Sequence, residues 1–306
     1  MALVLALAPL LTGWVRKVKA RLQRRRGASV FQPYHDLRRL LGKEVVLAEN
    51  ASWLFRTAPY MIFSFTWVAA SLVPTFAAGL IFSWTGDLIA IIALLGAARF
   101  LLTLAGMDIG TAFGGIGSSR EAMIAALAEP AMLMIIISLA LLAGSSQIST
   151  ITRFMDSPAV GLRVSLALAL VALLIVALAE NARIPVDNPA THLELTMVHE
   201  AMVLEYSGRH LAMIELTSAL KLLLMISMIG CIFVPIGLAV GGDGGPGGYA
   251  IGLAAYAAKL VVAGVMLGTF ETAIAKMRVF RVSNLLGGAL MLGLLATLLL
   301  FVSKGL

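Results

Sequence analysis

The sequence predicts an all-α, polytopic membrane protein, and three observations lead to that fold class. Of its 306 residues, 60% are hydrophobic and 13% are charged, whereas a soluble domain carries about 25% charged residues. Apolar runs of about 20 residues, enough for one bilayer crossing, recur along the whole chain. Helices satisfy their own backbone hydrogen bonds in lipid, so we expect about eight transmembrane helices. Residues 1–306 then form one integral membrane domain.

Eight segments rich in Leu, Ala, Ile, Val and Gly are the expected spans. They lie near 2–15, 58–82, 86–106, 122–144, 162–181, 211–239, 249–272 and 284–303. The first is short, because 14 residues rise only about 21 Å as a helix against roughly 30 Å of hydrocarbon. Either this helix continues through Lys17 and Lys19 with snorkelling side chains, or the native N-terminus lies upstream of Met1.

The basic residues predict how the spans are oriented. Of the 23 Lys and Arg, 17 lie in loops that follow the first, third, fifth and seventh spans and 3 lie on the opposite side, so the first group of loops should be cytoplasmic and both termini outside. Residues 16–57 form a basic loop, in which 30–42 has the pattern of an amphipathic interfacial helix that either anchors the chain or lines a cavity. Residues 182–210 form an acidic loop. The net charge of +7 reflects topology and lipid contacts, not nucleic acid binding.

Ionisable residues inside the spans are the main indication of function. A charge at the bilayer centre costs at least about 2.5–3.5 kcal/mol, so it persists where it faces water, a partner charge or a transport path. Several spans carry such a residue, which predicts either a connected polar seam or separate ion pairs that fix helix packing. The residues are Arg99, Glu129, Glu180, Glu215, Lys221, Lys259 and Glu271.

The acidic loop adds a second group of titratable side chains. Crowded carboxylates repel one another, which raises some of their pKa values toward neutrality, and histidine titrates near neutrality without help. Such groups suit proton transfer; the alternative is an ordinary solvated loop. The residues are Asp187, Glu194, Glu200 and Glu205 with His192 and His199.

The sequence argues against a metal site or a catalytic centre in this chain. His199-Glu200 begins like a zinc-binding helix, but Val203 stands where the second histidine is required. Cys231 is the single cysteine, which excludes an intrachain disulfide and a cysteine-held iron–sulfur cluster. We therefore expect no bound metal, no bound cofactor and no catalytic residue.

Three loops carry distinctive motifs. The acidic loop has Glu180-x-x-Arg183-x-Pro185-x-Asp187 and Glu205-Tyr206-Ser207-Gly208, the first cytoplasmic loop has Arg25-Arg26-Gly27 and Phe31-Gln32-Pro33-Tyr34-x-Asp36, and the loop after the third span has Gly117-x-Ser119-Arg120-Glu121-Ala122-Met123. These motifs resemble those of one family, the membrane subunit that joins the two arms of respiratory complex I (subunit 1). The same family includes the equivalent subunit of energy-converting nickel–iron hydrogenases, of the formate hydrogenlyase subunit 4 and hydrogenase-4 component C type. The resemblance covers essentially the whole chain.

Further motifs are more similar to the hydrogenase branch than to the quinone reductase. They are Gly106-x-Asp108-x-Gly110-x-x-Phe113, His199-Glu200-Ala201-Met202 and Glu271-x-x-x-Ala275-Lys276-x-Arg278. This branch implies a membrane anchor and coupling subunit that links electron transfer in peripheral subunits to proton or sodium movement.

The resemblance also implies partners and site residues. The expected partners are a hydrogenase-like large subunit and a small iron–sulfur subunit on the cytoplasmic face, which hold the nickel–iron centre and the clusters, and antiporter-like membrane subunits. The expected membrane is the cytoplasmic membrane of a prokaryote. The implied ion path joins Glu129, Glu180, Asp187, Glu194, Glu200 and Glu205 to the charges within the spans. The implied docking or chamber-lining residues are Arg25, Arg26, Gln32, Pro33, Tyr34, Asp36, Arg120, Glu121, Arg183, His199 and Tyr206.

Three other functions stay open at this point. The chain would line a quinone chamber if it belonged to the quinone reductase branch. A stand-alone secondary transporter also carries intramembrane charges, but it predicts inverted repeats and paired broken helices, which we do not find in the sequence. A passive anchor predicts that neutralising the buried charges leaves activity intact.

Overall fold

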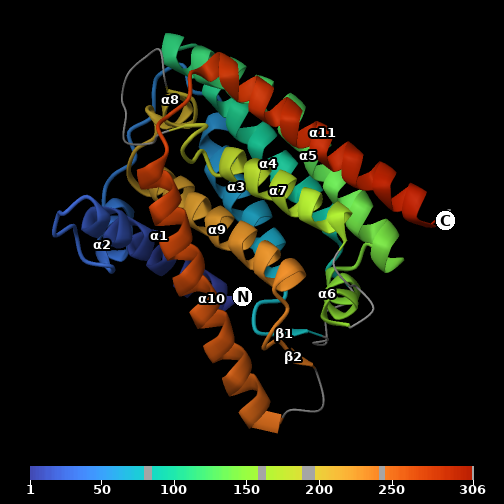
Figure 1. The fold of residues 1–306 in the computed structure, drawn as a ribbon. Helices are drawn as coiled ribbons and strands as arrows, with labels where there is room; N and C mark the ends of the chain where they lie inside the picture. The colour runs from blue at the N-terminus through green and yellow to red at the C-terminus, as the bar shows by residue number, and fades with distance from the viewer. Residues whose placement is uncertain (79–84, 158–162, 188–196, 241–244, 305–306) are drawn as a thin grey trace.

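The computed structural model describes residues 1–78, 85–157, 163–187, 197–240 and 245–304, and this part of the chain is predominantly helical (Figure 1). Short helices lie between the long ones, and two strands of two residues each pair in parallel. The elements are α1 (Ala2–Leu22), α2 (Gln32–Leu41), α3 (Trp53–Leu72), β1 (Ala77–Ala78), α4 (Leu88–Asp108), α5 (Ala112–Ala143), α6 (Ile148–Asp156), α7 (Val164–Glu180), α8 (His199–Val203), α9 (Gly208–Phe233), β2 (Ala239–Val240), α10 (Gly245–Ala273) and α11 (Val279–Lys304).

Each expected span corresponds to one long helix, and the all-α fold class is confirmed apart from the strands β1 and β2. Within the described part of the chain, five segments are long and apolar enough by themselves to cross a membrane: Leu88–Asp108, Ala112–Ala143, Gly208–Phe233, Gly247–Ala273 and Arg281–Val302. The helix Val164–Glu180 is apolar but shorter. The first helix does continue through Lys17 and Lys19, to Leu22.

Several predicted boundaries were wrong for local reasons. The second span was expected to reach residue 82, but α3 ends at Leu72, because Val73 precedes a proline and takes an extended conformation. Likewise, α9 ends at Phe233, shortly before Pro235, and not at 239. Helix α5 begins ten residues before the expected start at 122, since the side chain of Thr111 accepts a hydrogen bond from Gly114 N and caps it. Helix α6 was not expected.

The long helices pack in a continuous series. Helix α10 packs on α1, α1 on α9, α9 on α3, α3 on α4 and α4 on α5, while α11 covers α5 and α7. Figure 1 shows α10 and α1 at one edge of the bundle and α11 at the other. Helix α4 therefore lies in the interior of the bundle, and α10 lies at its edge.

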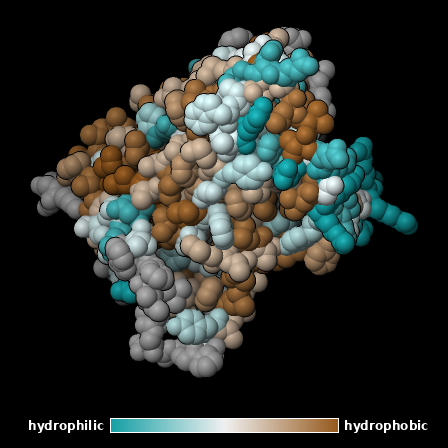
Figure 2. All heavy atoms as spheres, turned by 180° about the vertical axis from the view of Figure 1, so that it is seen from behind, coloured by the Kyte–Doolittle hydropathy of each residue, from teal (hydrophilic) through white to brown (hydrophobic). Residues whose placement is uncertain are grey.

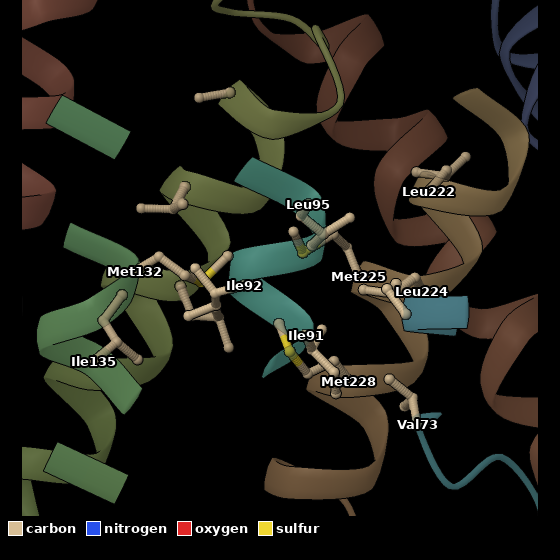
Figure 3. Packing of buried hydrophobic residues seen from close by; sticks show 14 of the residues in the cluster. Val73, Ile91, Ile92, Leu95, Met132, Ile135, Leu222, Leu224, Met225 and Met228 are labelled. Carbon is tan, nitrogen blue, oxygen red and sulfur yellow. The ribbon is translucent and has the colours of Figure 1, made fainter. Parts of the chain in front are cut away.

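Buried apolar side chains fill the space around α4. In Figure 3, Met132 of α5 lies on one side of the α4 residues Ile92 and Leu95, and Met225 and Met228 of α9 lie on the other. All five belong to the largest buried cluster. This close packing surrounds the charged side chains of the next section with apolar groups and raises the cost of leaving them unpaired.

The surface separates into a basic end and apolar flanks. Exposed arginines gather at the end of α1, in the α1–α2 loop and on α2: Arg21, Arg24, Arg25, Arg26, Arg38 and Arg39. In Figure 2, which views the molecule from behind, hydrophilic residues concentrate at the end that Figure 1 assigns to α2, and hydrophobic ones cover much of the remainder. An apolar flank on a chain with these long helices fits a lipid-facing surface.

Close helix contact at α4 and α5 depends on glycine and yields a prediction. A Cβ added at Gly114 would overlap the carbonyl oxygen of Gly106, whereas nothing lies within 4 Å of a Cβ at Gly115. We expect Gly114→Ala to lower the free energy of unfolding by about 1–3 kcal/mol through overpacking. Gly115→Ala should be neutral or stabilising by up to about 1 kcal/mol, because alanine favours helix. Thermal melts of the two purified variants test this, and equal melting temperatures would contradict it.

Candidate functional site

The centre of the bundle holds one ion network that joins four helices. Arg99 of α4 is 4% exposed and lies between two carboxylates. Its Nε is 2.9 Å from Glu121 Oε1 of α5, and its Nη1 is 2.8 Å from Glu180 Oε1 at the end of α7. The other Glu180 oxygen is 2.8 Å from Nζ of Lys221 in α9. We call Glu121, Arg99, Glu180 and Lys221 the central network; its two positive and two negative charges cancel.

Two small cavities meet at Glu180. One has a volume of about 50 Å³ and is lined by Arg99, Glu180, Asn181, His199 and Lys221 together with apolar and hydroxyl side chains. The second, of about 10 Å³, lies between Glu180 and Glu129. A water molecule needs roughly 10–15 Å³ of such space, so the first cavity has room for a few waters. Glu129 thus faces the central network across a space of about one water.

The short segment from Glu180 to Asp187 connects the central network to two further sets of charges. Arg183 Nη1 lies 3.4 Å from Glu271 Oε1 of α10, and the other Glu271 oxygen lies 2.7 Å from Lys19 Nζ of α1. Asp187, which is 2% exposed, accepts from Lys276 Nζ at 2.8 Å. Burial lowers the pKa of Arg183, and Glu271 acts in the opposite direction. The eight residues 180–187 therefore supply one side chain to the central network, one to the ion pairs of Glu271 and one to the ion pair of Lys276.

Residue His199 begins α8 beside this segment. Its backbone N–H donates to the second oxygen of Asp187 at 3.2 Å, and its ring lines the larger cavity. Burial lowers the pKa of the ring, while the charges of Glu121 and Lys221 act on it in opposite directions. His199 thus contacts Asp187 through its backbone and shares a cavity with the central network through its ring.

The α1–α2 region forms a separate surface. Pro33 is buried, the Gln32 amide donates to Asp36 at 3.1 Å, and the Tyr34 hydroxyl donates to the carbonyl of Ala6. Arg25 and Arg26 are exposed. The expected amphipathic helix is present as α2, packed on α1 and α9, and its basic residues remain available to a partner or a lipid surface.

Two other expected docking residues hold loops in place. The Arg120 guanidinium donates to the carbonyl of Met197 at 2.7 Å, which fixes the acidic loop to α5 at this residue. Tyr206 stacks on Phe55 with ring centroids 4.0 Å apart and donates to its carbonyl at 3.2 Å. Burial raises the pKa of this phenol, so it stays protonated as a donor.

Some expected path residues lie apart from the central network. Glu205 and Glu215 are exposed, and Glu200 is half-buried on α8. Lys259 lies on α10, away from the network. Glu194 and His192 fall outside the described residues. Among those that are described, no group of three or more His, Cys, Asp or Glu is arranged to hold a metal ion.

Reasoning from the sequence did not single out Lys19 and Lys276 as site residues. Both are the cations that neutralise buried carboxylates, Glu271 and Asp187. Lys19 had one signal, since it lay past the end of an apolar run that was too short. The pairing of Lys276 with Asp187 joins positions 89 residues apart, and no local pattern indicates it.

Long apolar helices around a neutralised ion network define a multi-pass membrane protein with a charged interior. A family model described as NADH dehydrogenase matches residues 1–302. The chain belongs to this family, of the complex I subunit 1 type, as its loop motifs implied.

Similar proteins come from several complexes. Formate hydrogenlyase subunit 4 of Escherichia coli K12 is 35% identical over 278 residues, which cover 90% of this chain and 89% of that protein. Hydrogenase-4 component C of the same organism is 35% identical, with 78% and 74% covered. NADH-ubiquinone oxidoreductase chain 1 of Triticum aestivum is 29% identical, with 72% and 68% covered.

A solved structure has the same fold. It is a chain of the membrane-bound sulfane sulfur reductase, an archaeal respiratory membrane complex, with a TM-score of 0.79 at 19% identity. The match covers 97% of this chain and 95% of that one. Because the match extends over nearly the whole of both chains, the two share the arrangement of helices described above.

The central network predicts how stability responds to loss of Arg99. Replacing it with Met leaves the buried carboxylates of Glu121 and Glu180 without their shared cation, which typically costs about 3–5 kcal/mol. We expect Arg99→Met to melt at a markedly lower temperature in detergent than the wild type, and the exposed-arginine control Arg56→Met to melt normally. Equal melting of the two variants would show that the network contributes nothing to stability.

The lowered pKa of His199 predicts a pH dependence. The folded chain binds this proton less readily than the unfolded chain, so the contribution of His199 to stability is present above its ordinary pKa of about 6.5 and is lost as pH falls below it. Wild type should therefore lose more stability than His199→Gln between pH 7 and pH 5, in melts at matched ionic strength. His35→Gln, at an exposed site, should follow the wild type; a wild-type profile for His199→Gln would refute the assignment.

Proposed function

We propose that this chain is the membrane anchor and ion-translocation coupling subunit of an energy-converting hydrogenase complex of the formate hydrogenlyase type. The observation that supports this role most directly is the buried network of Arg99, Glu121, Glu180 and Lys221 with adjoining cavities. The two Escherichia coli relatives support the type of complex. The chain itself carries no catalytic centre in this proposal, and the ion is a proton or sodium.

The topology that fits this role has eight spans with both termini outside. The eight long helices found among the described residues coincide with the apolar runs, and the basic residues gather in alternate loops of the sequence. The membrane would be the cytoplasmic membrane of a prokaryote. The basic α1–α2 region and the acidic loop then face the cytoplasm together, where a hydrogenase-like large subunit and a small iron–sulfur subunit would dock and hold the metal centres. Antiporter-like subunits would lie within the membrane.

A physical route for coupling starts at the segment Glu180–Asp187. A charge change in a docked subunit alters the potential at Asp187 and His199, which lie next to each other. Because Glu180 is shared by Arg99 and Lys221, a shift at this segment changes which cation holds its carboxylate. Water in the smaller cavity can relay a proton between Glu180 and Glu129. The buried side-chain oxygen of Asn181 borders the larger cavity, has no hydrogen-bond partner among the described residues, and is suited to bind a water molecule there.

The main alternative is the quinone-chamber subunit of NADH:quinone oxidoreductase. The same cavity beside His199 would then border the quinone. The hydrogenase assignment is favoured because the identity and the covered share are both higher for those relatives than for the wheat protein, at 35% against 29%. A stand-alone transporter has no comparable support.

Neutralising single carboxylates tests the coupling role. We expect Glu180→Gln, assayed in the intact complex, to reduce ion pumping at least tenfold while hydrogen turnover persists, because it removes the carboxylate shared by Arg99 and Lys221. Glu205→Gln tests the exposed end of the acidic loop in the same assays. The exposed-residue control Glu49→Gln should pump normally. Unchanged pumping in both the Glu180 and Glu205 variants would reduce the chain to a passive tether.

A further inference from the structure

Helix α10 has an apolar face that the rest of the chain leaves uncovered. Its contacts lie mainly along α1, where Gly264 and Gly268 admit Trp14 and Val18 and the Trp14 indole donates to Val261 O at 3.1 Å. Only 22% of its spanning window is buried, against 61% for α9. Large side chains on the open side are strongly exposed, including Ile251, Val262 and Met266.

Lys259 lies at the border of this open face. Its side-chain stem runs past Gly230 of α9, where Lys259 Cδ is 3.9 Å from the position of an added Cβ. None of the ion pairs among the described residues includes Lys259. Asp156, at the exposed end of α6, acts on it electrostatically, but the two form no ion pair in the described part of the chain. The ammonium group thus differs from Lys19, Lys221 and Lys276, which all have carboxylate partners within the chain.

The depth of Lys259 excludes a lipid headgroup as its partner. It lies 12 residues from Gly247 and 14 from Ala273, or about 18 Å and 21 Å along the helix. It is therefore near the middle of a hydrocarbon layer roughly 30 Å thick. Its four-carbon stem does not reach the phosphates of either leaflet by snorkelling. An ammonium at this depth is stabilised by an opposite charge that also lies in the membrane.

A second copy of this chain does not supply that charge. A two-fold pairing through α10 would bring the two Lys259 side chains together, and like charges repel. The carboxylate of α10, Glu271, is already paired with Lys19 and Arg183. The occupant must therefore be a different polypeptide.

We propose that the open face of α10 binds a transmembrane helix of another subunit, which places an Asp or Glu side chain opposite Lys259. At about 100° per residue around the helix, Ile251, Val262 and Met266 flank Lys259 on this face, and Ala254 and Ala258 lie farther round it, where small side chains let a helix backbone come close. The proposal extends the proposed function, since it locates a membrane partner in the complex. It depends on charge complementarity and not on the coupling route through Glu180.

A cross-linking experiment on the native complex identifies the occupant. A photo-reactive phenylalanine derivative is introduced in place of Val262, which is 56% exposed, and the linked peptides are identified by mass spectrometry. We expect a transmembrane peptide of a different subunit that contains Asp or Glu. Adducts to lipid only, to a second copy of this chain, or to a peptide without an acidic residue would each overturn the proposal.

Charge reversal tests the pairing itself. Lys259→Glu should lower the amount of that subunit that co-purifies at least tenfold, Lys259→Arg should retain it, and replacing the identified acid of the partner by Lys should restore it in the Lys259→Glu background. Lys43→Glu, at an exposed site, is the matched control. Immunoblots of this chain in membranes exclude simple loss of the protein. Full retention by Lys259→Glu would refute the pairing, whereas failure of the pumping test above leaves it untouched.

Discussion

The burial of the Arg99 guanidinium is the constraint on which the rest of the structure depends. An arginine with 4% exposure among apolar helices is tolerated only if carboxylates neutralise it. Its partners come from α5 and α7, and Glu180 brings in Lys221 from α9. The rotation and depth of four helices are therefore fixed together, because a shift of any one leaves a charge uncompensated in a low-dielectric interior. Close packing through Gly106 and Gly114 is compatible with that one arrangement.

The segment Glu180–Asp187 connects the central network to the charged residues of the acidic loop. Its first residue belongs to the central network, and its last holds Lys276 and the backbone of His199. Between them Arg183 pairs with Glu271. Charges on such a short, partly buried stretch cannot respond independently, since moving one changes the potential at the others. Binding of a partner at the acidic loop would therefore change the electrostatic potential at Glu180 through this segment.

The sequence predicted the long helices but neither the short helix α6 nor the pairings of the charged side chains. Long apolar runs predicted each long helix of the described residues, because lipid leaves helices as the available open-ended solution. Boundaries failed where a single residue decides, as at Thr111 and before Pro74. The polar stretch that contains Arg120 and Glu121 was taken for a loop, although it is helical. These side chains are satisfied by Met197 O and Arg99, partners that lie far away in the sequence and that local patterning does not indicate.

Charged residues of the same type divide into two classes by how they are satisfied. Lys221 and Lys259 both occupy apolar helices, yet Lys221 finds its carboxylate within the chain and Lys259 does not among the described residues. An ion pair closed within one chain forms as that chain folds, so it suits a network that must keep its geometry whatever is bound. An unpaired charge at the surface of a spanning helix instead raises the free energy of the isolated subunit in lipid, so pairing with a partner subunit favours assembly. If both proposals hold, the side of the molecule around α4 and α7 retains its charges for coupling, and the side around α10 presents one charge for recognition of a partner.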